Sequence, residues 1–286
     1  NTTGASNVAL GQFSLDANTT GGSNTALGHN ALTGNTTASN NTAVGKDALT
    51  ANTTGANNIA VGKDALTANT SSSFSTVIGS AAGSQSTGAG NTLMGYAVGA
   101  NSLALTTGTS NTIVGAHCDT TASGSTNAMG LGYSLDCAAG YTTLGVSSSD
   151  IRAPHGSASW ATVSDQRYKK DIVDSTAGLS FINALQPRTF KYKTLGELPE
   201  TFNAYEADST EVFKNSDTNH GFIAQEIKAA IDADSSIADG FKLWDDREDG
   251  SQEVAEAALI PILVKAIQEQ TALITALTAR ITTLEG

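Results

Sequence analysis

Short apolar blocks recur at a fixed spacing through the first half of the chain. The block Asn24-Thr25-Ala26-Leu27-Gly28 defines the pattern, and close copies occupy residues 7–11, 41–45 and 58–62. Looser copies end at Gly79, Gly95, Gly115 and Gly145. The glycines of the first five copies are each 17 residues apart, whereas later spacings drift and the copy around Met129 is difficult to register. Self-similarity at such a period is the signature of a repeat architecture.

Each block is short, and it is bounded by asparagine and glycine, so it predicts a short strand between turns. Neighbouring residues of a strand point to opposite faces, so each strand has one apolar face and one small-residue face. The apolar position holds Leu10, Leu27, Val44, Val61 and Ile78, and the small position holds Ala9, Ala26, Ala43 and Ala60. Each early repeat also carries a later leucine (15, 32, 49, 66) and then an asparagine (18, 35, 52, 69). We expect these asparagines to form a ladder from coil to coil.

Seventeen residues bury too little surface to fold alone, whereas stacked copies share a continuous core. The sequence therefore predicts an all-β shaft, a β-solenoid or β-roll, over residues 1–145. Its core is narrow, and each chain offers an apolar flank that favours association of three chains. The repeats resemble the Asn-x-Ala-[Ile/Val/Leu]-Gly units of trimeric adhesin heads and phage fibre shafts, a resemblance that says little about any ligand. The recurring Asn-Thr-Thr also matches glycosylation acceptors, but the period favours a turn role for these asparagines.

Charge density changes sharply along the chain. Residues 1–150 hold two basic and six acidic side chains, whereas residues 164–286 hold 12 basic and 21 acidic ones. The stretch between them, 146–163, is rich in serine and contains Pro154 and Gly156, so it predicts an extended connector. We expect a mixed, mainly helical domain over 164–258, with a helix from Leu179 that stops before Pro187, a strand over 189–193, and a strand or helix start over 221–231.

A heptad repeat fills the last segment, 259–286, and predicts a coiled-coil helix. The a positions hold Ile260, Ile267, Ile274 and Ile281, and the d positions hold Leu263, Gln270, Leu277 and Leu284. Isoleucine at a with leucine at d favours two strands, but the apolar side chains of Val264, Ala266 and Leu273 at e and g widen the apolar face and suit a higher order. Pro261 falls in the first turn, where proline is tolerated.

The net charge of −12 argues against a nucleic-acid backbone or an anionic membrane surface as partner. No apolar run approaches eighteen residues, so no membrane-spanning helix is expected, and no signal peptide is visible. Asn1 falls inside a repeat, so we expect the chain to be a piece of a longer protein.

Cys118 and Cys137 are interpreted as small buried hydrophobes in reduced form, with a disulfide as the alternative. Four histidines stand at no metal-ligand spacing (29, 117, 155, 220), and no phosphate-binding loop is present, so neither metal nor cofactor is expected.

Three motifs in the second half carry chemistry. The first is Ser164-Asp165-Gln166-Arg167-Tyr168-Lys169-Lys170-Asp171-Ile172, the second is Gly221-Phe222-Ile223-Ala224-Gln225-Glu226 after His220, and the third runs from Leu259 to Glu269. Together they resemble the endosialidase-type intramolecular chaperone found at the C-termini of phage tail spikes and fibres. That family opens on Ser-Asp-x-Arg-x-Lys-x-x-Ile, and every fixed position is met. The resemblance extends over Ser164 to Glu285, although residues 197–219 are not diagnostic.

The resemblance implies that the domain drives three chains to assemble and then cuts the bond before its first serine, here Val163–Ser164. Carried over, Ser164 is the nucleophile and Lys169 the base, while Asp165, Arg167, His220, Gln225 and Glu226 shape or support the site. A serine hydroxyl needs a base to take its proton, and a lysine serves as that base only if burial or a nearby cation lowers its pKa. The competing interpretation of Ser164-Asp165 is an ordinary helix N-terminus.

The expected protein is a homotrimeric phage tail fibre segment with one turnover of serine self-cleavage. Its partner would be a host cell-surface receptor or glycan, and its place the virion, after assembly in the host cytoplasm. One alternative is a tail spike depolymerase, but the shaft offers six Asp, no Glu and no Trp before Trp160 for a glycan site. Another is a trimeric adhesin with an uncleaved trimerisation cap. Cellular adhesins of that kind end in membrane-anchoring strands, unlike this chain.

Overall fold

The computed structural model describes every residue except 101–104, 158, 163, 235–236, 238–242 and 286. Two compact units divide the chain, Asn1–Tyr168 and Lys169–Gly286. Both Ser164 and Lys169 are described, and they belong to different units. Val163, on the other side of the expected cleavage bond, lies outside the described residues.

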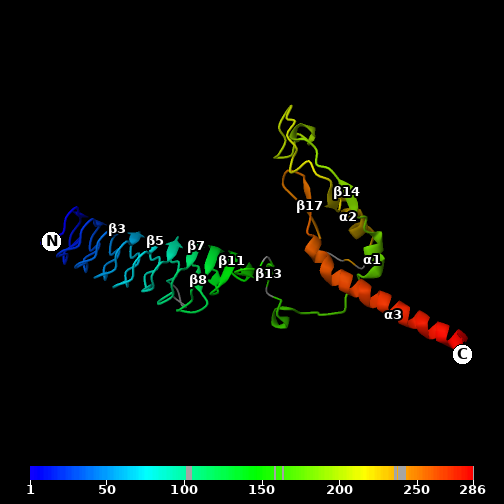
Figure 1. Ribbon diagram of the computed structural model, residues 1–286, viewed down its shortest axis with the longest axis horizontal. Coiled ribbons are helices and arrows are strands. Elements are labelled where there is room, and N and C mark those ends of the chain that lie inside the picture. The colour runs from blue at the N-terminus through cyan, green and yellow to red at the C-terminus, as the bar shows by residue number, and fades with distance from the viewer. Residues whose placement is uncertain (101–104, 158, 163, 235–236, 238–242, 286) are drawn as a thin grey trace. The chain divides into compact units, whose positions relative to one another are not determined.

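One sheet runs the length of the first unit, because each repeat adds a short strand at the same place in its coil (Figure 1). Its strands pair in parallel from β1 to β11, with equivalent residues of successive repeats in register, as in Ala26↔Ala43 and Ala43↔Ala60. The predicted β-solenoid is confirmed. The parallel strands are β1 (Val8–Leu10), β2 (Thr25–Leu27), β3 (Thr42–Val44), β4 (Ile59–Val61), β5 (Thr76–Ile78), β6 (Thr92–Met94), β7 (Thr112–Ala116), β9 (Met129–Tyr133) and β11 (Tyr141–Val146).

The small-residue position of each strand faces the interior of the solenoid. The side chains there are fully buried: Ala26, Ala43, Ala60, Val77, Leu93 and Ile113. The repeated leucines close the core from the opposite side, at Leu15, Leu32, Leu49 and Leu66. These leucines adopt a left-handed backbone with φ of 52–54°, which is uncommon for residues other than glycine. In the early coils the interior therefore holds two alanines, such as Ala43 and Ala48, beside one leucine, Leu49.

The larger apolar side chains of the same strands point outward, and we call this surface the outer face. Eight of them are between 36 and 67% exposed: Val8, Leu10, Leu27, Ile59, Ile78, Met94, Met129 and Leu131. The outward positions between them hold uncharged residues such as Thr25 and Val44. The apolar flank predicted from the repeats is therefore a continuous, uncharged sheet surface that a single chain leaves open to solvent.

Two asparagine ladders join the coils. In the predicted ladder, the Asn52 side-chain amide donates to Asn35 Oδ1 (3.1 Å) and to the Gly55 carbonyl (2.9 Å), and the Asn69 amide donates to Asn52 Oδ1 (2.9 Å). In the second, at the start of each block, the backbone N–H of Asn41 donates to Asn24 Oδ1 (2.9 Å). These side chains are almost fully buried, so the ladders satisfy polar groups that would otherwise be costly inside the shaft.

The glycine that ends each block is required by the spacing of the coils. At Gly28, φ is +134°, and a Cβ there would lie 2.5 Å from the carbonyl oxygen of Gly45 in the next coil. The same contact joins Gly79 to Gly95 and Gly95 to Gly115, where the spacing is not 17 residues, so the close approach of the coils requires the glycine whatever the length of the repeat.

The cysteines explain why the repeat near Met129 is difficult to register. In β9 the interior position is Gly130, and a Cβ there would overlap the sulfur of Cys137. Cys118 and Cys137 are free thiols that fill the core, as expected. Burial raises the pKa of Cys137 to about 12. Two short strands beside them, β8 (Asp119–Thr120) and β10 (Asp136–Cys137), form a separate parallel pair.

Antiparallel strands close the C-terminal end of the sheet. β12 (Ser149–Pro154) folds back on β11, and β13 (Ala161–Thr162) pairs with β12. The extended backbone predicted for 146–163 is therefore largely part of the sheet. Ser164 follows this last strand closely.

The second unit is mixed. Its α-helices are α1 (Leu179–Ala184), α2 (Ala224–Ala233) and α3 (Ile260–Glu285), and its antiparallel strand pairs are β14 (Arg188–Phe190) with β15 (Asn219–Gly221) and β16 (Trp244–Asp246) with β17 (Gln252–Val254). Single 3-10 turns cover Gln166–Tyr168, Leu195–Glu197 and Glu256–Leu259, the first of them in the first unit. A small core joins the helices and includes Phe181, Leu185, Ile227, Leu243, Leu259 and Ile262. The predicted helix at 179–185 and the strand leading into a helix near 221 are both present.

Helix α3 shows two different faces. Ile262 and Ala266 are buried, whereas the heptad residues Ile260, Ile267 and Ile274 are more than 60% exposed. The helical stretch Glu256–Glu285 contains an 18-residue segment with a mean hydropathy of 1.3, so it is long and apolar enough to cross a membrane. This is weak evidence, because length and composition alone decide it, and the absence of a membrane-spanning helix stays a prediction.

We predict that Asn52→Ala destabilises the shaft by about 2–4 kcal/mol, because it leaves partners in two neighbouring coils without their hydrogen bonds. Chemical denaturation followed by circular dichroism measures the change. Thr54→Ala, at an exposed position of the same coil, is the matched control and should change the free energy of unfolding by less than about 0.5 kcal/mol. Equal effects of the two substitutions would contradict the role of the ladder.

Candidate functional site

The first motif begins as an exposed single turn. The Asp165 carboxylate accepts the backbone N–H of Arg167 (2.8 Å) and Arg167 Nε (3.0 Å), and its Oδ2 lies 2.6 Å from the terminal guanidinium nitrogen. The bonds from Arg167 hold the pKa of Asp165 below its usual value. Asp165 and Arg167 therefore form a local clamp that shapes the chain directly after Ser164, and the supporting roles expected of them at the cleavage site stay a prediction.

The two residues expected to carry the chemistry are both exposed in the single chain. Ser164 and Lys169 are accessible to solvent, and their neighbours Tyr168, Ile172 and Val173 are 61–86% exposed. Because the boundary between the units falls between Tyr168 and Lys169, the dyad stays a prediction.

The second motif positions its residues at the junction of β15 and α2. His220 lies opposite Thr189 in the β14–β15 pair and is exposed, as is Gln225 in the first turn of α2. Glu226 accepts two hydrogen bonds from the guanidinium of Arg188, at 3.0 and 2.8 Å. This bidentate pair joins β14 to α2 and lowers the pKa of Glu226. Glu226 therefore supports the fold around the motif.

The third motif leads from the 3-10 turn Glu256–Leu259 into α3 and joins this helix to the small core. Leu259 and Ile262 are buried in the small core. Glu269, the last residue of the motif, accepts the backbone N–H of Leu179 at Oε2 (2.8 Å). Sequence reasoning assigned no role to Glu269 and missed Arg188, because neither pairing leaves a periodic signal in the chain.

Comparison with known proteins identifies the region that these motifs occupy. The model of a peptidase family described as "chaperone of endosialidase" matches residues 164–234, beginning at Ser164. The C-terminal region contains an endosialidase-type chaperone domain. No curated protein and no solved structure matches the chain. The family match covers the first two motifs of the chaperone domain, and the shaft lies outside it.

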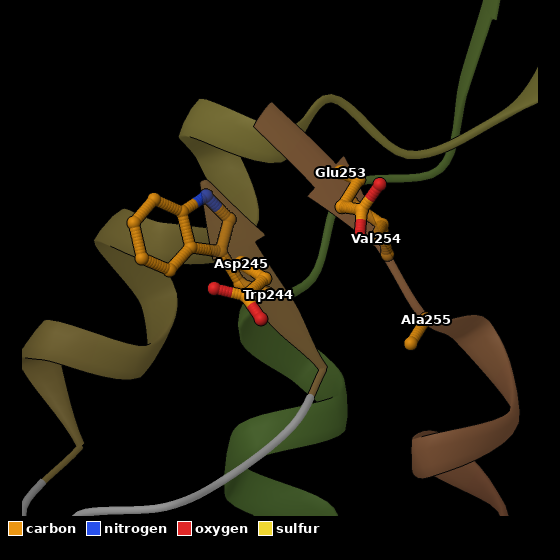
Figure 2. Close-up of a pocket in the computed structure, with 5 residues that line it drawn as sticks. All are labelled: Trp244, Asp245, Glu253, Val254 and Ala255. Atoms are coloured by element: carbon orange, nitrogen blue, oxygen red, sulfur yellow. The ribbon is translucent and has the colours of Figure 1, made fainter. Parts of the chain in front are cut away.

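A shallow hollow of about 340 Å³ lies beside the β16–β17 hairpin, lined by Trp244, Asp245, Glu253, Val254 and Ala255 (Figure 2). Asp245 and Glu253 are direct cross-strand partners, and Arg247 Nε donates to Glu253 at 2.7 Å. None of the motif residues lines this hollow. Within the described part of the chain, no three His, Cys, Asp or Glu side chains gather as a metal site would require.

We predict that Arg188→Ala returns the pKa of Glu226 to its ordinary range, because the guanidinium is the main cause of the lowered value. A carboxylate with a lowered pKa stabilises the fold above its ordinary pKa, and this contribution is lost as the pH falls through the lowered value. Titration of the carboxyl signal by NMR measures the shift. Arg247→Ala, which removes the partner of Glu253, should leave Glu226 unchanged. An unshifted Glu226 in Arg188→Ala would disprove the pairing.

Proposed function

We propose that the chain is the C-terminal part of a homotrimeric phage tail fibre whose chaperone domain directs assembly and then cuts the Val163–Ser164 bond. The observation that carries the proposal is the family match, which begins at Ser164, next to the strands that close the shaft. A β-solenoid followed by such a domain fits a tail-fibre-like protein. In this proposal the fibre belongs to the virion, is assembled in the host cytoplasm and meets a host receptor or glycan.

The proposed cleavage is a hydrolysis of the Val163–Ser164 peptide bond that proceeds through an ester and consumes one water molecule. Ser164 Oγ attacks the Val163 carbonyl carbon while the neutral Lys169 amine takes the hydroxyl proton. The C–N bond breaks, and the nitrogen leaves as the α-amino group of Ser164 after receiving a proton. The acyl group is then an ester on Ser164 Oγ, and water hydrolyses it to the Val163 carboxylate and the free hydroxyl.

Assembly supplies the environment that a single chain lacks. A lysine is neutral only when burial or neighbouring positive charge disfavours its ammonium form. Lys169 is exposed in one chain, and so are the apolar residues around it. Two surfaces support three copies as the source of that burial, the uncharged outer face of the shaft and the exposed heptad residues of α3. Cleavage would therefore follow assembly, and the shaft product would keep the strands that close it.

We predict that the purified chain separates into residues 1–163 and 164–286, whereas Ser164→Ala and Lys169→Ala stay whole. A denaturing gel with intact-mass measurement gives the result. Ser216→Ala and Lys193→Ala, which remove the same functional groups from exposed positions of the second unit, should be cut like the parent. A parent that stays whole after assembly would mean that the domain is a retained trimerisation cap.

We predict that Leu27→Asp prevents assembly of the shaft, because three carboxylates would then meet on an uncharged apolar surface. Leu27 is 42% exposed in one chain, so the substitution leaves the coil itself intact. Sedimentation should detect single chains. Thr37→Asp places the same charge at an exposed turn of the same coil and should leave assembly unchanged. Normal assembly of Leu27→Asp would show that the outer face is not the contact between copies.

A further inference from the structure

A carboxylate from α3 fixes the point at which the chain enters α1. The Leu179 N–H donates to Glu269 Oε2 at 2.8 Å, although 90 residues separate the two. Gly178 lies against the same group, and a Cβ there would come within 2.6–2.8 Å of the Glu269 carboxylate atoms. Ala177, one residue earlier, is buried in the small core. We call this contact of Glu269 with Gly178 and Leu179 the tether.

The tether lies on the helix that carries the heptad repeat. Ile262, Ala266 and Glu269 follow one another at helical spacing and face α1, and the first two are buried. Ile267, two residues before Glu269, belongs to the exposed heptad stripe at 61% exposure. The same turn of α3 therefore has two sides. One side packs against the small core, and the other carries exposed heptad residues that other copies could contact.

The tether also limits where Lys169 can be. Lys169 precedes Ala177 by eight residues, and an extended chain covers at most roughly 3.3–3.6 Å per residue. The intervening residues, including Ile172 and Val173, are exposed, so the tethered end is where this segment becomes part of the core. Contacts that hold α3 in an assembly therefore also hold the C-terminal end of the segment that carries Lys169, the proposed base.

We propose that Glu269 is a positioning residue that couples assembly of α3 to self-cleavage, by holding the Lys169-bearing segment on the helix that joins the copies. The inference rests on the proposed self-cleavage. Its chemistry is that of a hydrogen-bond acceptor, because its oxygen orders the backbone at Gly178 and Leu179. Lys265, at 3.9 Å on the same helix, is the nearby cation.

The test uses the full chain in two backgrounds. On the Ser164→Ala background, which stays uncut, assembly and thermal stability are measured for each Glu269 and Gly178 variant. On the parent background, the rate of cleavage is measured for the same variants by intact mass. Glu285→Ala, at the exposed end of the same helix, is the control and should match the parent in both.

Glu269→Ala should slow cleavage about tenfold or more while the trimer still forms, since small misplacements of reacting groups cost about this much. Glu269→Gln should stay close to the parent, because its amide oxygen accepts the same Leu179 N–H. Gly178→Ala should slow cleavage like Glu269→Ala, because its Cβ displaces the carboxylate. The double variant should be no slower than Glu269→Ala alone, because both changes remove one contact.

Cleavage of Glu269→Ala at the parent rate would overturn the inference. So would loss of assembly by a Glu269→Ala chain that still folds on the uncut background, which would make Glu269 a residue of the contact between copies. If Glu269→Ala fails to fold, the comparison of Glu269→Gln with Gly178→Ala decides: equal rates overturn the inference, and a slow Gly178→Ala supports it. If the parent chain itself is never cut at Val163–Ser164, the proposed self-cleavage is refuted instead, and the intact mass of the parent distinguishes this result from a failure of the inference about Glu269.

Discussion

The width of one coil is the constraint on which the shaft depends. An early 17-residue coil encloses only two alanines, such as Ala43 and Ala48, and one leucine, such as Leu49. So small a core buries little apolar surface per coil, and stability has to come from contacts between coils. The asparagine ladders supply them along the turns, and the glycines permit the close approach that the ladders need. Other apolar side chains of the strands, such as Leu27 and Ile78, lie on the outer face.

The second unit also buries little apolar surface in its core, but its core is built differently. Its small core depends on one side of α3 packing against α1 and α2, and the heptad side of α3 is left exposed. Each unit therefore exposes a regular, mostly apolar surface in the single chain. In the shaft this surface is the outer face, and in the second unit it is the heptad side of α3. In the proposed assembly these two surfaces act at different times, since the chaperone domain is cut away and the shaft stays. The outer face then has to hold the copies together alone, which agrees with its length and lack of charge.

Much of the shaft could be predicted from the sequence, because period and residue class are both visible there. The ladder of Asn35, Asn52 and Asn69 and the buried leucines follow directly from the repeat. The left-handed backbone at Leu32 and Leu49 could not be predicted, since it arises from the tight turn and burial offsets its cost. The irregular copy at Gly130 depends on Cys137 filling its place, a contact between residues without periodic spacing. In the chaperone domain, the motifs named Glu226 and included Glu269, but their partners Arg188 and Leu179 are set by tertiary structure.

The most direct test of this account is the number of chains in the intact protein. Native mass spectrometry of the uncut Ser164→Ala chain should give three times the mass of one chain, because the outer face and the α3 heptads each require copies. A stable single chain at micromolar concentration would contradict the account, since its outer face and heptad stripe would then remain exposed to water.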